Sequence, residues 1–232
     1  MQLDVRDVIQ ETILESGVWD PAATQCLTTV LKTGDTFLDI GANAGYFTLL
    51  AAKCVGPTGK VLAIEPNPSM AKQIRRFADR SGLTNVEIEE VACSSSLKAG
   101  KLYLGLASNT GGSSLSEQNV RSNDYVDVSC IQADALMHKH SLSRINLVKI
   151  DVEGAEHDVV RGMNEILRDL RPKIVIELID DLLRSFSTTV DSVLDYLKGF
   201  QYEVRPLGGH SNYLCVPYEQ MSGCFEKICK GR

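Results

Sequence analysis

The strongest constraint on the fold is one stretch near the start of the chain, Thr36-Phe-Leu-Asp-Ile-Gly-Ala-Asn-Ala-Gly-Tyr-Phe-Thr48. It opens with a short apolar run that ends in an acid, which is typical of a buried parallel strand. Gly41 and Gly45 then permit a tight turn in which the backbone can approach a ligand closely. Apolar residues follow at helical spacing from Phe47 to Cys54. The stretch therefore predicts a strand, a glycine turn and a helix, the first half of a nucleotide-type binding unit.

A second strand with an acid at its end follows, Lys60-Val-Leu-Ala-Ile-Glu65. Glu65 comes about twenty residues after Gly45, the spacing at which a carboxylate binds ribose hydroxyls. Asp39 would repel a pyrophosphate but attract an ammonium or sulfonium cation. S-adenosylmethionine (SAM) carries both cations and a ribose and has no phosphate, so the pattern favours SAM. An NAD-dependent oxidoreductase would share the strand, turn and helix, but we would expect a third glycine and no Asp39.

Composition narrows the classes of partner. The 232 residues, of which 44% are hydrophobic and 23% charged, predict one domain over residues 1–232. A net charge of −6 without Lys/Arg blocks argues against nucleic acid, and no apolar run approaches the ~20 residues of a membrane span. The polar residues 1–7 do not resemble a signal peptide. Seven cysteines without a C-x-x-C pair favour a cytoplasmic protein, and Cys224 and Cys229, with no His cluster nearby, do not predict zinc.

The first 33 residues carry two helical patterns, one over residues 3–14 and one from Asp20-Pro21 to Gly34. We expect this segment to cover the sheet, with a lid over the substrate as the alternative. The cofactor-binding half then spans residues 34–92. It ends in a third strand, Asn85 to Val91, which places Ala92 beside an adenine ring.

Residues 94–132 interrupt the alternation of strand and helix. Two strand-like runs, Lys101–Gly105 and Tyr125–Ser129, predict a hairpin inserted at the carboxyl edge of the sheet. Between them Asn109-Thr-Gly-Gly-Ser-Ser114 is either a flexible turn or a loop that faces the substrate, and the sequence does not distinguish the two.

Residues 133–232 form the catalytic and substrate-binding half of the predicted domain. They contain four further strands: Ile145–Asp151, Pro172–Glu177, Tyr202–Val204 and Tyr213–Val216. The last two lie close enough in sequence to form an antiparallel hairpin, with His210 and Tyr213 near it. The whole pattern predicts an α/β protein with a doubly wound, Rossmann-like sheet of about seven strands.

Four of the predicted strands end in acids, namely Asp39, Glu65, Asp151 and Glu177. The carboxyl ends of parallel strands meet at one edge of the sheet, so we expect these side chains to converge there. The densest stretch is Lys149-Ile-Asp-Val-Glu-Gly-Ala-Glu-His157. In it Glu153, Glu156 and His157 share one face if a helix starts at Glu153. The alternative is that these carboxylates only complement the dipole of a helix N-terminus.

These motifs together resemble the FkbM family of class I SAM-dependent methyltransferases. The resemblance rests on four stretches in the family's order and spacing: Leu-Asp39-Ile-Gly-Ala-Asn-Ala-Gly45-Tyr, Glu65-Pro-Asn-Pro68, Asn109…Gly112-Ser113-Ser, and Val-Lys-Ile-Asp151-Val-Glu-Gly-Ala-Glu156. It runs from about Gly34 to Glu177. It implies a seven-stranded Rossmann-like sheet, SAM as cofactor, and O-methylation of sugars or secondary metabolites, hence a small-molecule or carbohydrate acceptor.

The resemblance also implies roles for single residues. Carried over by position, the methionine part of SAM would be held by Asp39, Gly41, Asn43 and Gly45, and the ribose by Glu65. Asp134, in Gln-Ala-Asp134-Ala-Leu, matches a family acid and is grouped with the cofactor-binding residues.

Methylation of a hydroxyl requires positioning of the acceptor and removal of its proton. Asp151 is the first candidate for the base, and Glu153, Glu156 and His157 come after it. In a rival mechanism Asp151 and Glu177 bind Mg²⁺, which lowers the pKa of the hydroxyl, and no residue is assigned to a metal on the sequence alone. A catalytically silent SAM-binding scaffold is a further alternative, but it would be expected to lose the Asp151 stretch.

Overall fold

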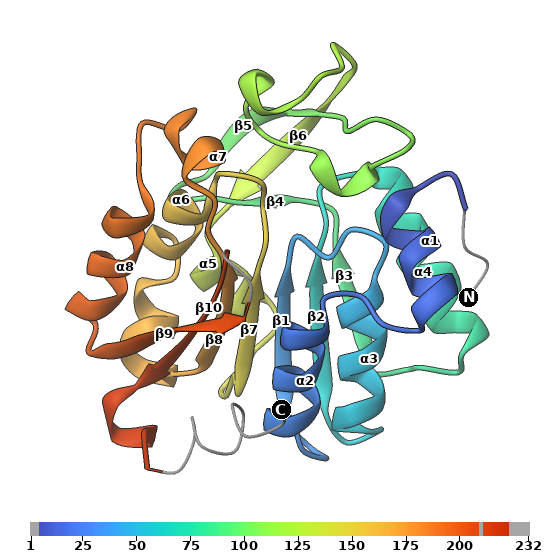
Figure 1. Ribbon diagram of the computed structural model, residues 1–232. Coiled ribbons are helices and arrows are strands. Elements are labelled where there is room, and N and C mark those ends of the chain that lie inside the picture. The colour runs from blue at the N-terminus through green and yellow to red at the C-terminus, as the bar shows by residue number, and fades with distance from the viewer. Residues whose placement is uncertain (1–4, 209–210, 223–232) are drawn as a thin grey trace.

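The computed structural model describes residues 5–208 and 211–222. Its central sheet contains seven strands, which in chain order are β1 Thr36–Ile40, β2 Lys60–Ile64, β3 Val86–Glu89, β7 Leu147–Ile150, β8 Lys173–Glu177, β9 Tyr202–Gly208 and β10 Asn212–Pro217. They are arranged β3-β2-β1-β7-β8-β10-β9 (Figure 1). The first five strands in this order run parallel, and β10 is antiparallel to both of its neighbours. The predicted seven-stranded sheet and its terminal hairpin are confirmed.

Both faces of the sheet are buried, which explains why its strands read as continuous apolar runs. Successive residues of a strand point to opposite faces. In β1, Phe37 packs into one hydrophobic cluster and Leu38 into another. Because Lys149 pairs with Asp39 in the register of β7 and β1, the two residues lie side by side in adjacent strands.

One layer of helices covers the face to which Phe37 points. It consists of α2 Pro21–Val30, α3 Tyr46–Val55 and α4 Pro68–Arg80. The opposite face is covered by elements from the second half of the chain, shown in yellow to orange in Figure 1: α5 Ala133–Lys139, α6 Glu156–Arg161, the π-helical segment η3 Ile166–Leu170, α7 Asp180–Arg184 and α8 Val190–Gly199. A short 3-10 turn, η4 Tyr218–Gln220, follows β10.

The insertion forms a second, three-stranded sheet at one end of the molecule. Its strands are β4 Ala92–Cys93, β5 Lys98–Tyr103 and β6 Tyr125–Ile131, in the order β4-β6-β5 (Figure 1). The antiparallel pairing of β5 with β6 confirms the predicted hairpin. Ala92, however, was expected to follow directly on the third strand of the main sheet. It belongs instead to β4, which pairs with β6. The loop between β5 and β6 contains two 3-10 turns, η1 Thr110–Gly112 and η2 Glu117–Asn119.

The N-terminal segment divides between two positions. Helix α2 covers the sheet as expected, with Ala23, Cys26 and Leu27 fully buried. The first helix, α1 Val8–Ser16, begins and ends later than predicted. It lies next to the loop between β5 and β6, far from it in sequence (Figure 1).

Five cysteines lie in the described ranges, and all of them are free thiols. Cys224, Cys229 and His210 lie outside the described residues. None of the helices in the described ranges is long and apolar enough to cross a membrane.

Candidate functional site

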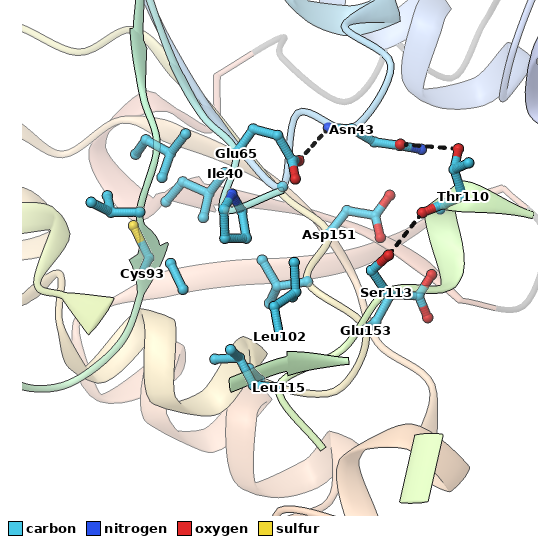
Figure 2. Close-up of a pocket in the computed structure, with 18 residues that line it drawn as sticks. Ile40, Asn43, Glu65, Cys93, Leu102, Thr110, Ser113, Leu115, Asp151 and Glu153 are labelled. Atoms are coloured by element: carbon cyan, nitrogen blue, oxygen red, sulfur yellow. Dashed lines mark hydrogen bonds between the residues drawn. The ribbon is translucent and has the colours of Figure 1, made fainter. Parts of the chain in front are cut away.

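Two adjoining cavities open at the carboxyl ends of β1, β2 and β7, where ligands of open α/β sheets bind. They share five lining residues: Gly41, Asn43, Gly111, Asp151 and Glu153. The rest of the first cavity is formed by Ile40, Ile64, Glu65, Pro66, Val91, Ala92, Cys93, Leu102, Thr110, Ser113, Leu115, Val152 and Ala155 (Figure 2). The rest of the second is formed by Val8, Ile9, Trp19, Ala42, Ala44, Tyr46, Phe47, Asn109, Lys149 and Glu177.

The two glycines of the turn have different roles. Gly41 has a φ of 85°, and a Cβ there would lie 1.8 Å from the carbonyl oxygen of Asp151. It therefore allows the ends of β1 and β7 to meet, and it lines both cavities. Gly45, with a φ of 84°, would place a Cβ 2.9 Å from Cγ1 of Ile74 in α4. Gly45 lines neither cavity, so its direct contact with the cofactor is not supported; it permits α3 and α4 to pack.

Asp39 lies beneath the turn rather than in either cavity. It is 1% exposed, and its Oδ2 accepts a hydrogen bond of 2.6 Å from Thr48 Oγ1 in the first turns of α3. Its Oδ1 is buried without a hydrogen-bond partner. Burial raises the pKa of this carboxyl, and the nearby Lys149 ammonium opposes that rise. Asp39 thus anchors α3 through one of its oxygens, and its contact with a ligand cation stays a prediction.

Glu65 lies where the sequence predicted a ribose-binding acid. It is 6% exposed and lines the first cavity. Its Oε2 accepts from the backbone N–H of Asn43 at 2.7 Å, and its Oε1 from the backbone N–H of Asn67 at 2.8 Å (Figure 2). A carboxylate has about four acceptor sites, so two remain for ligand hydroxyls. Burial raises the pKa of Glu65 to about 7, although the two N–H donors oppose this.

The far side of the first cavity is an apolar slot. Ala92, predicted to lie beside an adenine ring, is one wall of it, and Ile64, Cys93, Leu102 and Leu115 contribute the others (Figure 2). Cys93 is buried, and burial raises the pKa of its thiol well above the usual range, so it behaves as an apolar residue. The slot has the chemistry of a site for a flat, weakly polar ring.

A buried cation lies at the centre of the acids that line the second cavity. Lys149 is 4% exposed, its Nζ is 2.8 Å from Asp151 Oδ2 and 4.7 Å from the centre of the Phe47 ring. Glu177, the last residue of β8, faces the same group and is held by Ser211 at 2.9 Å. Burial, followed by the charge of Asp151, raises the pKa of Glu177 to about 7.

Glu153 does not lie on a helix, so the condition under which Glu153, Glu156 and His157 would share one face is not met. Its φ is 55° and that of Gly154 is 107°, so both lie in a tight loop, and α6 starts only at Glu156. The loop is fixed by the insertion, because the carbonyl oxygen of Glu153 accepts from Ser114 Oγ at 2.7 Å and from Asn119 Nδ2 at 2.9 Å. The Glu153 carboxyl faces both cavities, and burial, reinforced by the charges of neighbouring acids, raises its pKa to about 8.

Glu156 and His157 do not join the cavities. Glu156 is 3% exposed, and its Oε1 accepts from the backbone N–H groups of Val152 and Gly154, both at 3.1 Å. It therefore holds the loop from inside, and burial raises its pKa to about 7. His157 points to a different hollow, where its Nδ1 is 2.9 Å from Thr188 Oγ1. Both were predicted as second-line catalytic residues, and the late start of α6 turns them away.

Asp134 also has a structural position. Its two carboxyl oxygens accept from the backbone N–H groups of Glu165 and Ile166, both at 3.0 Å. It therefore caps the start of the segment that leads into η3, and it lines neither cavity. Its expected place among the cofactor-binding residues is not supported by this geometry.

Sequence reasoning missed several lining residues. Trp19 was assigned no role, Phe47 was taken only as part of a helical pattern, and Leu102 and Leu115 lie in the insertion, whose side chains were not singled out. Thr110, Gly111 and Ser113 come from the loop whose role was left open, and the structure places them at the cavities. The one available signal was the Gly/Ser-rich composition of that loop.

The metal alternative receives no support from the arrangement of side chains. Within the described ranges no group of three or more His, Cys, Asp or Glu side chains is placed to hold a metal ion. Asp151 and Glu177 do lie together, but Lys149 already supplies a positive charge at Asp151.

Comparison with known proteins identifies the family. A family model described as "Methyltransferase FkbM domain" matches residues 39–204. The chain belongs to the FkbM methyltransferase family. The match includes the glycine turn, Glu65, the insertion and the Asp151 loop, and it excludes α1 and α2.

Curated relatives agree with this assignment. The chain is 29% identical over 192 residues to "Methyltransferase 1" of Beauveria bassiana, which covers 74% of each chain. It is 30% identical over 177 residues to "Methyltransferase sdnD" of Sordaria araneosa, covering 63% of this chain and 67% of that protein. It is 28% identical over 150 residues to "Hexuronic acid methyltransferase AglP" of Haloferax volcanii, covering 61% and 55%.

Solved structures share the fold. A methyltransferase FkbM from Methylobacillus flagellatus KT superposes with a TM-score of 0.56 at 14% identity, over 82% of this chain and 48% of that one. The FkbM domain thus spans about half the length of that protein. SMU.1697c, a methyltransferase from Streptococcus mutans solved with S-adenosylhomocysteine (SAH), superposes with a TM-score of 0.52 at 12% identity, over 85% and 98%.

The first cavity fits SAM. Its apolar slot suits an adenine ring, and Glu65 offers free acceptor sites to a ribose. None of its described lining residues is Lys or Arg, so a pyrophosphate would meet no cation there. The single cation of the second cavity, among described residues, is already paired with Asp151. The residues present therefore fit a phosphate-free cofactor better than a dinucleotide.

Proposed function

We propose that this FkbM domain transfers a methyl group from SAM to a hydroxyl group of a small-molecule or carbohydrate acceptor. The observation that carries the proposal is the position of Asp151. It directly follows β7 and lines both cavities, of which one contains the apolar slot and the other the aromatic and acidic side chains. A carboxylate at this position is within reach of the acceptor oxygen where the methyl group arrives.

SAM, when bound, supplies a methyl group already activated by its sulfonium. The protein then has to orient the acceptor and remove its proton. Asp151 would accept that proton as the acceptor oxygen bonds to the methyl carbon and the carbon–sulfur bond breaks to leave SAH. The Lys149 ammonium donates to Asp151 Oδ2 and so fixes the direction of the carboxylate. It also favours the ionised form of the acids beside it.

Glu153 and Glu177, the other two acids of the second cavity, have a different role. With pKa values of about 8 and about 7, Glu153 and Glu177 hold protons for much of the time near neutral pH. A protonated carboxyl can donate a hydrogen bond to an acceptor oxygen. We therefore assign proton removal to Asp151 and acceptor orientation to Glu153 and Glu177.

The second cavity supports a carbohydrate-like acceptor. Trp19, Tyr46 and Phe47 offer ring faces and edges, while Glu153 and Asn109 offer polar groups for hydroxyls. The name of the Haloferax volcanii relative, a hexuronic acid methyltransferase, supports a sugar.

Two other functions remain as alternatives. An NAD-dependent oxidoreductase is disfavoured by the absence of Lys or Arg from the described lining of the first cavity. A silent SAM-binding scaffold would need no base, yet Asp151 and its Lys149 partner are both in place.

The test combines binding with turnover. Calorimetry should show that SAH binds and NAD does not. Incubation with methyl-labelled SAM and a panel of neutral sugars, amino sugars and uronic acids, followed by mass spectrometry, should show the label on a hydroxyl oxygen. Binding of NAD but not SAH would overturn the cofactor, and SAH binding without any labelled product from the panel or from cell extracts would favour the scaffold.

A further inference from the structure

We propose that Asp7 is a positioning residue of the cofactor site, which holds the insertion loop over the cleft and slows the release of the cofactor. The inference rests on the proposed function, since it takes SAM or SAH as the ligand. Asp7 lies outside the region matched by the family model, which begins at residue 39. The N-terminal segment would thus complete a site whose other parts belong to the family domain.

The carboxyl group of Asp7 joins two distant segments. It is 1% exposed. Its Oδ1 accepts from the backbone N–H of Gln10 at 3.0 Å and so caps α1. Its Oδ2 accepts from both the backbone N–H and the hydroxyl of Thr110, each at 2.8 Å, across 103 positions of sequence. The helix cap uses only Oδ1, whereas both hydrogen bonds to Oδ2 come from the insertion loop.

Two further contacts fasten α1 to the same loop. The backbone N–H of Val8 donates to the carbonyl oxygen of Ser108 at 3.0 Å. Ile9 lies against Gly111 so closely that a Cβ on the glycine would be 2.5 Å from Ile9 Cδ1. The absence of a side chain at Gly111 is what lets the helix rest on the backbone of the loop. Gly111 itself lines both cavities, so α1 packs directly against a wall of the site.

The contacts continue from the loop to the ribose-binding acid. Thr110 Oγ1 is 3.5 Å from the side-chain oxygen of Asn43 in the glycine turn (Figure 2). This contact is weaker than the bond to Asp7, because the single hydroxyl hydrogen is directed to the 2.8 Å partner. The backbone N–H of Asn43 then donates to Glu65. A series of contacts thus runs from Asp7 through Thr110 and Asn43 to Glu65.

This arrangement predicts how a ligand leaves. Thr110 and Gly111 line the first cavity, so a molecule that fills it is in contact with the loop that Asp7 holds. Lifting the loop breaks two hydrogen bonds to a buried, charged acceptor, which are among the stronger hydrogen bonds in proteins. Removing them should speed loop opening and ligand release far more than ligand capture, because most changes in affinity arise in the dissociation rate.

The chain offers a fluorescent reporter and a matched control. Trp19 is its single tryptophan and lines the adjoining cavity, so stopped-flow fluorescence can follow SAH binding and release. Asp20 is the control. It also caps a helix, through Ala23 N at 3.1 Å, and it also bonds a distant segment, through Asn212 at 3.0 Å, but it does not touch the loop.

The experiment compares the wild type with Asp7→Ala, Thr110→Val, the double variant and Asp20→Ala. We expect Asp7→Ala to raise the SAH dissociation rate about tenfold. The double variant should be no faster than Asp7→Ala by more than about twofold, because Asp7→Ala already removes the hydroxyl hydrogen bond that Thr110→Val removes. Hydrogen exchange in residues 105–113 of the ligand-free protein should accelerate in Asp7→Ala and stay unchanged in Asp20→Ala.

Equal dissociation rates in the wild type and Asp7→Ala would overturn the proposal, as would equal acceleration in Asp20→Ala. Should Asp7→Ala fail to fold, Asp7→Asn and Thr110→Val decide instead, since both leave the Oδ1 cap of α1 in place. Faster exchange with unchanged release would reduce Asp7 to a structural contact and also overturn it. Failure of SAH to bind the wild type would overturn the proposed function itself. This outcome can be told apart from failure of the Asp7 proposal, because the hydrogen-exchange measurement uses the ligand-free protein.

Discussion

The ammonium nitrogen of Lys149 lies 2.8 Å from Oδ2 of Asp151, and the lysine is 4% exposed. Its strand neighbour is Asp39, and Glu177 faces the same group. The buried Lys149 ammonium therefore interacts with three acids that lie in or directly after three adjacent strands. Burial opposes the charge of Lys149, but the acids prevail and raise the pKa of the ammonium above its usual value. Lys149 is therefore charged at neutral pH.

Replacing this cation should shift the pH dependence of catalysis. In Lys149→Met the acids lose the charge that favours their ionised forms, so their pKa values rise. We expect turnover at neutral pH to fall at least about tenfold and the acid limb of the kcat profile to move up by about one pH unit. Lys60→Met, an exposed lysine on β2, is the control and should leave the profile unchanged. A fall in turnover without any shift of the limb would show that Lys149 has only a structural role.

The base itself is tested by Asp151→Asn. The change keeps the shape of the side chain but removes the proton acceptor, while Glu65 and the apolar slot remain. We expect SAH affinity to stay within a few-fold of the wild type and turnover to fall by roughly 10²–10⁴. Calorimetry and initial rates with the labelled acceptor measure the two effects. Near-normal turnover in Asp151→Asn would move the assignment to Glu153.

A metal-assisted mechanism makes a separate forecast for the same group. Under it EDTA abolishes activity, Mg²⁺ restores it, and Glu177→Gln lowers turnover as much as Asp151→Asn. Under the mechanism proposed here, activity persists in EDTA, and Glu177→Gln mainly raises the KM for the acceptor. Measuring rates with and without EDTA decides between them.

The buried acids predict an unusual pH dependence of stability. Glu65, Glu156 and Glu177 have pKa values of about 7, and Glu153 of about 8, against an ordinary 4.5. Between about pH 4.5 and 8 the folded chain thus holds more protons than the unfolded chain, and the free energy of unfolding falls as the pH rises. We expect it to be lower at about pH 8 than at about pH 5.5 by at least about 2 kcal/mol, measured by urea unfolding.

Glu153→Gln provides the control for this effect. It removes the acid with the highest of these pKa values while keeping the size of the side chain. The difference in unfolding free energy between the two pH values should shrink, and the variant should be more stable than the wild type at about pH 8. A stability that rises steadily from about pH 5.5 to 8 would contradict the burial of these charges.

The contact between Gly41 and Asp151 can be tested against a glycine with the same backbone shape. Gly41→Ala would place a methyl group 1.8 Å from the Asp151 carbonyl oxygen, and backbone cannot move aside cheaply. Gly82 has a φ of 65° and no atom within 4 Å of a Cβ. We expect Gly82→Ala to cost about 1–2 kcal/mol from the left-handed backbone alone, and Gly41→Ala to cost more than about 3 kcal/mol or to prevent folding. Similar unfolding midpoints for the two variants would contradict the close approach of β1 and β7.

The strands of the sheet and the acids at their ends were predictable because their signals are local. Buried parallel strands are short apolar runs, so Thr36–Ile40 and Lys60–Ile64 could be recognised from a few residues each. The position of Glu65 followed from its spacing to the glycine turn. Asp151 was placed correctly for the same reason, because the carboxyl end of a parallel strand has to reach the ligand-binding edge.

The helix after β7 was the point at which local reasoning failed. The spacing of Glu153, Glu156 and His157 would bring them to one face only if a helix started at Glu153. The structure starts α6 at Glu156, because Glu153 and Gly154 take left-handed backbone angles and the insertion binds the Glu153 carbonyl. The loop is held by Ser114 and Asn119, which lie 39 and 34 positions away, so no local pattern reports those angles.

The sequence by itself determined the seven-stranded fold, the glycine turn and the rim of acids, since each depends on neighbours along the chain. Only the tertiary structure decided which acids face the cavities and which hold the backbone. Asp39, Asp134 and Glu156 turn inward to meet N–H and hydroxyl groups of other elements, because a buried carboxylate is tolerated only with donors. Asp7 meets Thr110 for the same reason, and the 103 positions between them hide that contact from the sequence.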